Sequence, residues 1–334
     1  MKSIVFTKPC LAELVNEDIP QIKPGYVLIK LERSTISAGT ERANLVGDPN
    51  VSPVVGVKVA FPRRSGYSSA GIVMQIGDGV ENLSIGDRVC VSWSSHSEYC
   101  LIPSEQVYKL PDNVSMSAGA LVHISVFPLA AIRKCNLEFG ESAIVMGLGV
   151  LGIMSIGLLR TAGAAPIIAV DPVKEKRELA IKLGADYALD PFEEGFAERV
   201  KDITGGGAKV AIEITGNGKG LDMVLDCMAR FGRVALLGCT RNSDFTIDYY
   251  RKVHGPGITL VGAHTMARPA LQSSHGWWTQ RDDAEAVIKM LSCGRLNFDT
   301  LVDEVHSPNQ ATDIYTRLAN EKAFPIVQFD WTEI

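Results

Sequence analysis

Three glycines near the middle of the chain have the spacing of a phosphate-binding turn. In "VMGLGVLG", Gly147, Gly149 and Gly152 form the pattern G-x-G-x-x-G. Glycine at the first position permits a tight turn, and at the second it lets a pyrophosphate approach the backbone. At the third it lets a helix pack closely on a strand. The N–H groups of the following helix would then face the phosphates. Because such glycine patterns also occur in unrelated turns, the motif becomes specific only through its context.

An acidic residue at the end of the next apolar segment supplies that context. Asp171 follows "PIIAV" and lies 22 positions after Gly149. A carboxylate at this point accepts hydrogen bonds from the ribose hydroxyls of NAD(H) and would repel the 2′-phosphate of NADP(H). Asp171 could instead cap the helix "PVKEKREL". The basic residues Lys174, Lys176 and Arg177 leave NADP(H) open as an alternative.

Alternating strand and helix patterns surround the glycine turn. From residue 142 onward, strand-like segments such as "SAIVMG", "PIIAVD", "KVAIEIT", "RVALLG" and "GITLVGAH" alternate with helical ones. The helical segments are "GVLGIMSIGLLRTAG", "KEKRELAIKLGA" and "GKGLDMVLDCMARFG". Apolar strands between amphipathic helices are typical of βαβ units, so the pattern predicts a doubly wound parallel sheet.

The chain before this region has a different, all-β character. Alternating or β-branched runs such as "GYVLIKLERSTI", "AGIVMQIG", "DRVCVSW" and "EYCLIP" are separated by turn sequences, which predicts a small barrel. The tail carries two amphipathic helices, "QRDDAEAVIKMLSCG" and "NQATDIYTRLAN", and a strand in "FPIVQFDW". Because the tail is too short for a core of its own, we expect it to pack back on the first domain. The predicted domains are 1–124, 125–266 and 267–334.

The composition excludes several classes of function. The chain has 334 residues, a net charge of −5 and 46% hydrophobic residues, so a nucleic-acid-binding surface is not expected. The start, "MKSIVFTKPC", has no signal-peptide pattern. Seven scattered cysteines, none in C-x-x-C spacing, predict free thiols in a reducing compartment. We therefore expect a cytoplasmic protein without a thiolate metal cluster, a membrane span or a nucleic-acid partner.

Several landmarks together resemble one enzyme superfamily over nearly the whole chain. They are "GYVLIKLERSTISAGTE", "GYSSAGIVMQIGDGVENLSIGDRV", "SEYCLIPSEQVYKLPDNVS", "VMGLGVLG", "AVDPVKEKRELAIKLGADYALDP" and "LLGCT". The sequence resembles the medium-chain dehydrogenase/reductase superfamily, which includes the zinc alcohol and sorbitol dehydrogenases. The resemblance implies a GroES-like β-barrel catalytic domain, an inserted Rossmann NAD-binding domain and a C-terminal return to the first domain.

The cofactor residues follow from the glycine turn and from the resemblance. We expect the following residues to contact NAD(H): Gly147, Gly149, Val150, Leu151, Gly152, Asp171, Lys176, Thr215, Gly238 and Cys239.

The sequence differs from the metal-dependent members of this superfamily at the positions of the metal ligands. Where metal-dependent members have Cys-Gly-Thr-Asp and Gly-His-Glu, this sequence has "AGTE" and "GYS", so Ala38, Tyr67 and Ser68 replace residues of the zinc site. His123 aligns with the third ligand, and the four-cysteine structural zinc lobe is absent. Because a catalytic zinc needs three protein ligands, one histidine cannot hold it. The sequence resembles a zinc-free subgroup that includes bacteriochlorophyllide dehydrogenases and two-domain oxidoreductases associated with polysaccharide biosynthesis.

Without zinc, side chains must polarise the substrate oxygen and move a proton. By resemblance, Tyr67, His123 and Thr40 are the catalytic candidates. Because the reference pKa of histidine is ~6.5 and that of tyrosine ~10, His123 is the better base near neutrality. Each candidate also has a structural interpretation: Tyr67 could fill the volume of the lost zinc, His123 could be a satisfied helix-start residue, and Thr40 could cap a turn. We expect Glu41 to be structural.

The main functional expectation is a zinc-independent, NAD(H)-dependent oxidoreductase. Its substrate would be a secondary alcohol or ketone that is sugar-like or otherwise polyhydroxylated. Two alternatives stay open: a quinone or enoyl reductase that reduces conjugated double bonds, and a catalytically silent nucleotide-binding subunit. We also expect a homodimer that forms through the apolar edge strand in "GITLVGAHTM".

Overall fold

The computed structural model describes residues 1–52, 54, 57, 59–321 and 323–334. The chain forms two compact units. The first contains Met1–Ile124 and Ala284–Ile334, and the second contains Ser125–Asp283. The boundary expected after residue 266 therefore falls inside the second unit, which continues to residue 283. Within the described ranges, no helix is long and apolar enough to cross a membrane.

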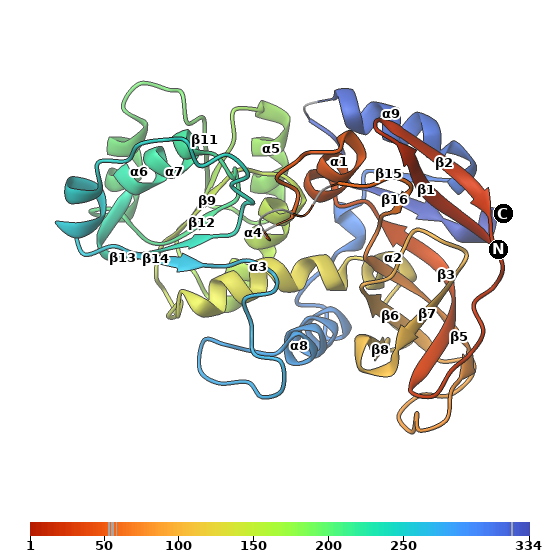
Figure 1. The fold of residues 1–334 in the computed structure, drawn as a ribbon. Helices are drawn as coiled ribbons and strands as arrows, with labels where there is room; N and C mark the ends of the chain where they lie inside the picture. Colours follow the sequence, from red (N-terminus) through yellow and green to blue (C-terminus); the bar gives the residue numbers. More distant parts are fainter. Residues whose placement is uncertain (53, 55–56, 58, 322) are drawn as a thin grey trace. The chain divides into compact units, whose positions relative to one another are not determined.

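The second unit is built on a six-stranded parallel sheet. Its strands are β9 (Ala143–Met146), β10 (Ile167–Val170), β11 (Tyr187–Leu189), β12 (Ala208–Glu213), β13 (Met228–Leu236) and β14 (Thr259–Gly262). Their order is β11-β10-β9-β12-β13-β14, and every neighbouring pair is parallel (Figure 1). Numbered within the unit, this is 3-2-1-4-5-6, the order of a Rossmann sheet. The predicted doubly wound fold is confirmed.

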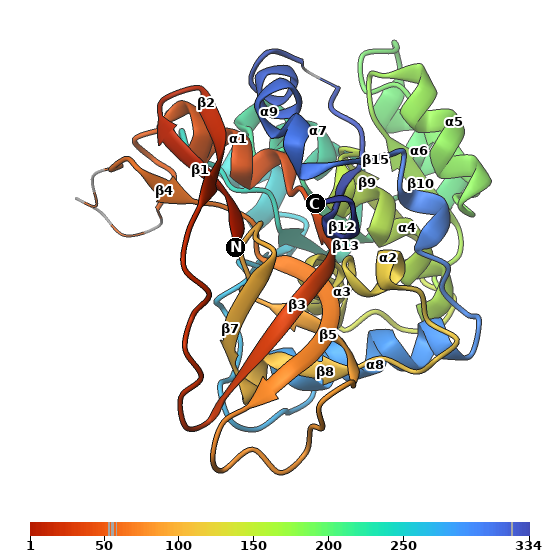
Figure 2. The same cartoon turned by 90° about the vertical axis from the view of Figure 1, so that its right-hand side faces the viewer.

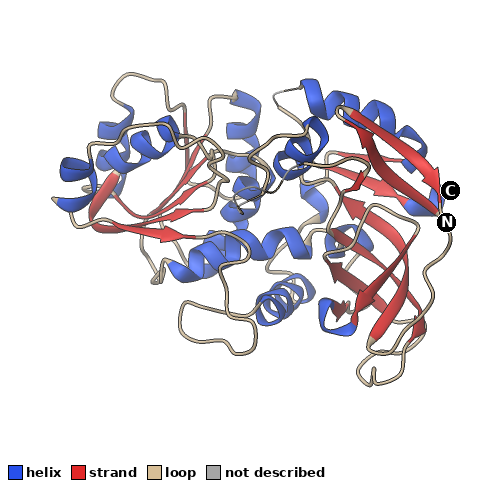
Figure 3. Ribbon diagram, viewed as in Figure 1, coloured by secondary structure: helices blue, strands red, loops and turns tan. Residues whose placement is uncertain are grey.

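Helices cover both faces of this sheet (Figure 3). They include α4 (Val150–Ala162), α5 (Lys174–Lys182), α6 (Phe196–Thr204) and α7 (Gly218–Asp226). Strands β9 and β10 are apolar throughout, and Ile144 and Ile168 within them are fully buried. Burial on both faces explains why these strands appear as continuous apolar runs without polar alternation.

One helix ends earlier than its sequence pattern predicts. The helical pattern in "GKGLDMVLDCMARFG" continues to residue 232, but α7 ends at Asp226 and β13 begins at Met228. Met228 pairs with Ala208 of β12. Pairing with the central sheet therefore overrides the helical propensity of this segment.

The first unit contains a seven-stranded mixed sheet. Its strands are β3 (Tyr26–Thr35), β5 (Ser68–Ile76), β6 (Arg88–Ser92), β7 (Tyr99–Pro103), β8 (Val107–Lys109), β15 (Glu304–His306) and β16 (Val327–Asp330). The long strand β3 lies between β5 and β7 (Figure 2). Its first part, from Tyr26 to Lys30, pairs with β7, and its last part, Arg33 to Thr35, pairs with β16. Strand β3 thereby connects the early strands with the C-terminal segment.

A smaller sheet and several helices complete the first unit. The sheet consists of β1 (Lys2–Lys8), β2 (Leu11–Asn16) and β4 (Arg63–Arg64), and the helices are α1 (Ala38–Val46), α2 (Met116–Gly119) and α9 (Ala311–Asn320). Phe6, Tyr315, Phe329 and Trp331 are buried together in the core of this unit. Three of these four come from the last twenty residues. The C-terminal tail therefore packs in the core of the first unit.

Two further helices each contain residues of both units. They are α3 (Val122–Lys134) and α8 (Gln280–Ser292). Single-turn helices also occur at Ser104–Gln106, Tyr250–His254, Asp299–Leu301, Pro308–Gln310 and Trp331–Glu333.

Candidate active site

The glycine turn joins β9 to α4, as its sequence context predicts. Gly147 has a φ of 100°, a conformation that favours glycine. A side chain on Gly152 would collide with the carbonyl oxygen of Gly147. The structure therefore gives the first and third glycines the conformational and packing roles expected for them.

Gly149 differs from the other two because no neighbouring protein atom in the described structure requires a glycine there. Its φ is −72°, and a Cβ at this position would have no heavy atom within 4 Å. Gly149 is the N-cap of α4 and provides no side chain to cap that helix. Open space in front of a helix N-terminus is what a bound pyrophosphate requires.

Asp171, at the end of β10, is tied to the glycine turn. One carboxylate oxygen accepts a hydrogen bond from the backbone N–H of Leu148 at 2.9 Å, and the other accepts from the N–H of Val173 at 2.9 Å. The side chain is 7% exposed. Asp171 therefore organises the turn in addition to presenting a carboxylate to a ribose. Each oxygen retains a second lone pair for a ligand hydroxyl.

Of the three basic residues that left NADP(H) open as a cofactor, two form ion pairs within the second unit. The Arg177 guanidinium donates to the carbonyl oxygen of Asp171 at 2.7 Å and pairs with Asp190 at 3.1 Å. Lys174 forms an exposed pair with Glu178 at 3.7 Å. Lys176 is half-buried on the first turn of α5.

A buried glutamate that sequence reasoning did not identify organises the other predicted cofactor loops. Glu213 ends β12, and its carboxylate accepts hydrogen bonds from the N–H and hydroxyl of Thr215. Its carbonyl oxygen accepts from the N–H groups of Leu237 and Gly238, both at 2.9 Å. Burial raises the pKa of Glu213, and the hydrogen bonds from Thr215 oppose that rise. The signal in the sequence was an acidic residue inside the otherwise apolar strand "KVAIEIT".

The loops after β12 and β13 approach each other closely. A side chain on Gly238 would meet the backbone of Gly216, and one on Gly216 would meet the backbone of Cys239. Thr215, Gly238 and Cys239 thus lie on adjacent loops at the carboxyl ends of parallel strands, where ligands of such sheets bind.

In the first unit, Tyr67 and His123 are brought together, as expected. Their ring centroids are 5.5 Å apart and the rings meet edge to face. Trp93 contacts both rings, at 5.9 Å from Tyr67 and 4.7 Å from His123. Tyr67 is half-buried, whereas His123 is 2% exposed. The imidazole therefore packs within a small aromatic cluster beside the phenol.

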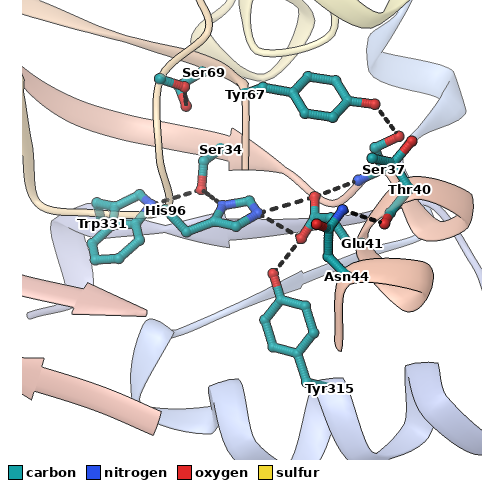
Figure 4. Close-up of polar contacts among 11 residues, drawn as sticks. Ser34, Ser37, Thr40, Glu41, Asn44, Tyr67, Ser69, His96, Tyr315 and Trp331 are labelled. Carbon is teal, nitrogen blue, oxygen red and sulfur yellow. Dashed lines mark hydrogen bonds and ion pairs between the residues drawn. The ribbon is translucent and has the colours of Figure 1, made fainter. Parts of the chain in front are cut away.

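The Tyr67 hydroxyl donates a hydrogen bond to the hydroxyl of Ser37 (Figure 4). Ser37 is buried and immediately precedes α1. Sequence reasoning did not select Ser37, although it is the serine of "ISAGTE". The pair provides two exchangeable hydroxyl protons, and the ring of Tyr67 contacts that of His123.

The segment that contains the catalytic candidate Thr40 is helical. Helix α1 begins at Ala38, so Thr40 and Glu41 lie in its first turns. The Thr40 carbonyl accepts from the Asn44 amide at 2.8 Å, and the Thr40 side chain is half-buried. Apolar residues at positions 38, 43 and 45 pack on the core, which stabilises a helix where the glycine and threonine favoured a loop.

Glu41, which the sequence analysis expected to be structural, belongs to a buried polar network (Figure 4). Its carboxylate accepts from the Ser37 N–H at 2.8 Å and from the Tyr315 hydroxyl at 2.5 Å. The Nε2 atom of His96 lies 3.0 Å from the same carboxylate, and Nδ1 lies 2.7 Å from the Ser34 hydroxyl. His96 had no role in the sequence analysis.

The side chains at the metal-ligand positions do not fit a zinc ion. Ala38 has no donor atom, and the Ser68 hydroxyl is buried and donates to the carbonyl oxygen of Ala120 at 2.6 Å. Tyr67 is engaged with Ser37. Elsewhere in the described ranges, no three His, Cys, Asp or Glu side chains are grouped so that they could hold a metal. A catalytic zinc takes three protein ligands, and this donor set does not provide them.

A Rossmann sheet with a glycine turn, in the same chain as a GroES-like unit, defines a dinucleotide-dependent oxidoreductase of the alcohol dehydrogenase type. Residues 23–136 match the alcohol dehydrogenase GroES-like domain, and residues 150–277 match the family described as zinc-binding dehydrogenase. The chain belongs to this medium-chain dehydrogenase family.

Individual relatives support this assignment. The chain is 30% identical to L-threonine 3-dehydrogenase of Pyrococcus horikoshii over 337 residues, which cover 90% of each protein. It is 25% identical to D-guloside 3-dehydrogenase of Escherichia coli K12 over 344 residues, covering 96% of this chain and 97% of the relative. The solved structure of 2R,3R-butanediol dehydrogenase from Bacillus subtilis matches with a TM-score of 0.82 and 26% identity, covering 98% and 99% of the two chains.

Proposed function

We propose that this protein is a metal-independent dehydrogenase that prefers NAD(H) and interconverts a secondary alcohol and a ketone. The observation that carries the proposal is the hydrogen bond from Tyr67 to Ser37, beside the ring of His123. Tyr67 and His123 align with ligand positions of the metal-dependent members, and Ser37 immediately precedes a third such position, Ala38. A pair of hydroxyls can polarise a substrate oxygen and relay its proton without a metal.

The second unit fits a dinucleotide. The open space at Gly149 and the N-terminus of α4 suit a pyrophosphate, and the Asp171 carboxylate suits the adenosine ribose. When bound, the nicotinamide ring accepts or supplies the hydride. Thr215, Gly238 and Cys239 lie on loops that Glu213 holds in place, and we assign them to cofactor contacts.

In alcohol oxidation, the chain's own residues handle the proton. The substrate hydroxyl passes its proton to the Tyr67 oxygen as Tyr67 passes its own proton to Ser37. In the same concerted step Ser37 releases its own hydroxyl proton to water, so neither hydroxyl gains net charge. The reverse direction protonates the oxygen of a ketone by the same path. His123, in ring contact with Tyr67, is the second acid–base candidate.

The relatives' names point to a common substrate chemistry. Position 3 of L-threonine, position 3 of a D-guloside and the carbinol carbons of 2,3-butanediol all bear secondary hydroxyls. We therefore propose a polyhydroxylated or sugar-like secondary alcohol as substrate. A place in the zinc-free subgroup of bacteriochlorophyllide dehydrogenases and two-domain oxidoreductases, and a cytoplasmic location, belong to the same proposal.

The proposal is tested by measuring NAD⁺ reduction with L-threonine, (R,R)-2,3-butanediol, an alkyl D-guloside and galactitol 1-phosphate. NADH oxidation is measured in parallel with the corresponding ketones, with quinones and with conjugated enones. We expect turnover with at least one alcohol or its ketone and none with quinones or enones. Turnover restricted to quinones or enones would favour a conjugate reductase, and NADH binding without any turnover would favour a silent nucleotide-binding subunit.

A further inference from the structure

Glu41 is a fully buried carboxylate that receives hydrogen bonds from three different groups. The donors are the Ser37 backbone N–H at 2.8 Å, the Tyr315 hydroxyl at 2.5 Å and Nε2 of His96, which lies 3.2 and 3.0 Å from the two oxygens. Glu41, His96 and Tyr315 each have no measurable exposure. Because a buried charge is costly without such partners, the three donors fix the position of this carboxylate.

The donors are themselves held in place. Nδ1 of His96 lies 2.7 Å from the hydroxyl of Ser34, and that hydroxyl accepts a hydrogen bond from the indole N–H of Trp331 at 2.8 Å. Burial and the neighbouring Glu41 carboxylate raise the pKa of Tyr315 well above its usual value, so its hydroxyl stays protonated and remains a donor. The network is therefore anchored to strand β3, to helix α9 and to the single-turn helix Trp331–Glu333.

The start of α1 shows what this network does. A serine at an N-cap ordinarily accepts a hydrogen bond from an N–H in the first turn of its helix. Ser37 makes no such bond, and its hydroxyl accepts from Tyr67 instead. Meanwhile its backbone N–H donates to Glu41, in the manner of one half of a capping box.

We propose that Glu41 is a positioning residue that keeps the Ser37 hydroxyl available to Tyr67. The Glu41 carboxylate binds the Ser37 N–H and places negative charge in the first turns of α1, where the helix dipole favours it. Without that carboxylate, the Ser37 hydroxyl would turn to cap the helix, and the hydrogen bond from Tyr67 to Ser37 would be lost. The catalytic consequence of this inference rests on the proposed function, whereas the hydroxyl geometry can be tested without turnover.

The geometric test follows the Tyr67 ring by NMR in protein labelled with ¹³Cζ-tyrosine, with Tyr67→Phe to assign the resonance. Ser37→Ala removes the acceptor of the Tyr67 hydrogen bond. The chemical-shift change in this variant defines how the Tyr67 resonance responds to loss of that bond. We expect Glu41→Gln to move the Tyr67 resonance in the same direction, because one amide oxygen cannot serve three donors. If Glu41→Gln does not fold, Glu41→Asp replaces it, since its shorter side chain cannot span the same donors.

A matched control comes from the same unit. Glu304 accepts two hydrogen bonds from Arg317 and one from His306. Like Glu41→Gln, the change Glu304→Gln therefore removes a carboxylate that is bound by a histidine and by a second residue. We expect Glu304→Gln to leave the Tyr67 resonance unchanged. The proposal is overturned if Ser37→Ala moves the resonance and the Glu41 variant does not, or if Glu304→Gln moves it equally.

A kinetic cycle tests the consequence for catalysis with (R,R)-2,3-butanediol or L-threonine, whichever supports turnover. Glu41→Gln should lower kcat on the order of tenfold with little change in KM, a smaller loss than the ~10²-fold expected for an acid–base group itself. The double variant with Ser37→Ala should be no slower than Ser37→Ala alone, because both changes interrupt one path. Additive losses would refute positioning through Ser37. A shifted Tyr67 resonance in a protein that turns over no alcohol would instead refute the proposed function and leave the positioning intact.

Discussion

The carboxylate of Asp171 accepts a hydrogen bond from the backbone N–H of Leu148, within the glycine turn, at 2.9 Å. One residue thus both shapes the pyrophosphate turn and presents charge at the position expected for the adenosine ribose. Its two tasks can be separated, because a neutral side chain with one acceptor oxygen can still bond Leu148.

We predict that NADH binds at least tenfold more tightly than NADPH, a difference of about 1.4 kcal/mol. The physical reason is the repulsion between the Asp171 carboxylate and a 2′-phosphate. Asp171→Asn should narrow the ratio while keeping the turn, whereas Asp171→Ser should weaken both cofactors because it also loses the bond to Leu148. Fluorescence titration measures both affinities, and equal affinities in the unmodified protein would contradict the assignment.

Tyr67→Phe should reduce turnover by roughly 10²-fold or more, the usual scale for one acid–base group. The change removes the hydroxyl that donates to Ser37 and keeps the ring against Trp93 and His123. His123→Ala should flatten the pH dependence of the rate near neutrality. Steady-state kinetics with NADH-binding controls check both variants. Unchanged rates in both would indicate that these rings fill space and that the proton leaves by way of Thr40 and water.

Protein purified without chelators should contain no stoichiometric zinc, and EDTA should leave turnover unchanged. The reason lies in the donor set, because Ala38, Tyr67 and Ser68 occupy positions that need sulfur, imidazole and carboxylate groups for zinc. Elemental analysis of the purified protein and rates before and after chelation check this prediction. One zinc per chain that is lost together with activity would be the opposite result.

We predict a homodimer that forms through β14. This strand is the edge of the six-stranded sheet, and its free side can pair with a second copy. Sedimentation at micromolar concentration should give twice the chain mass of 36.1 kDa. Thr259→Lys, at an exposed position of this edge, should favour the monomer without unfolding it. A monomeric unmodified protein would rule out this mode of assembly.

Glu304→Gln should lower stability at neutral pH, and its effect should disappear in acid. Hydrogen bonds from Arg317, followed by His306, lower the pKa of Glu304 from 4.5 to about 2, against the effect of burial. The folded pKa lies below the unfolded one, so this contribution is full above pH 4.5 and is lost as pH falls toward 2. Urea unfolding of the two proteins at pH 7, 4 and 3 should show a shrinking difference. A constant difference would mean that the carboxylate charge is not the cause.

The sequence was most informative where the relevant residues are close along the chain. The glycine turn and Asp171 lie within one βαβ unit, and their spacing alone predicts their arrangement. Ser37 and Tyr67 are thirty residues apart, and Glu41 and His96 are fifty-five apart. Such contacts depend on how β3, α1 and the segment after β6 pack, which no local pattern contains.

The same limit applies to the helix at residues 38–46, which no local pattern in the sequence indicated. Gly39 and Thr40 favour a turn by local propensity, but burial of Leu45 and satisfaction of the Ser37 N–H by Glu41 stabilise a helix. The resemblance to metal-dependent members identified the positions of Tyr67 and His123. It did not identify Ser37, because a serine before the "AGTE" segment has no counterpart among the metal ligands.

The return of the tail to the first unit has a consequence for biosynthesis. Tyr315 and Trp331 supply donors to Glu41 and Ser34, but the ribosome makes them about three hundred residues later. The second unit is continuous in sequence, so it can fold while the tail is still being synthesised. The first unit must wait, with Glu41 lacking a donor until α9 has emerged and with Ser34 lacking one until Trp331 has emerged. A chain that stalls before Trp331 would carry a nucleotide-binding unit and an unfinished proton path.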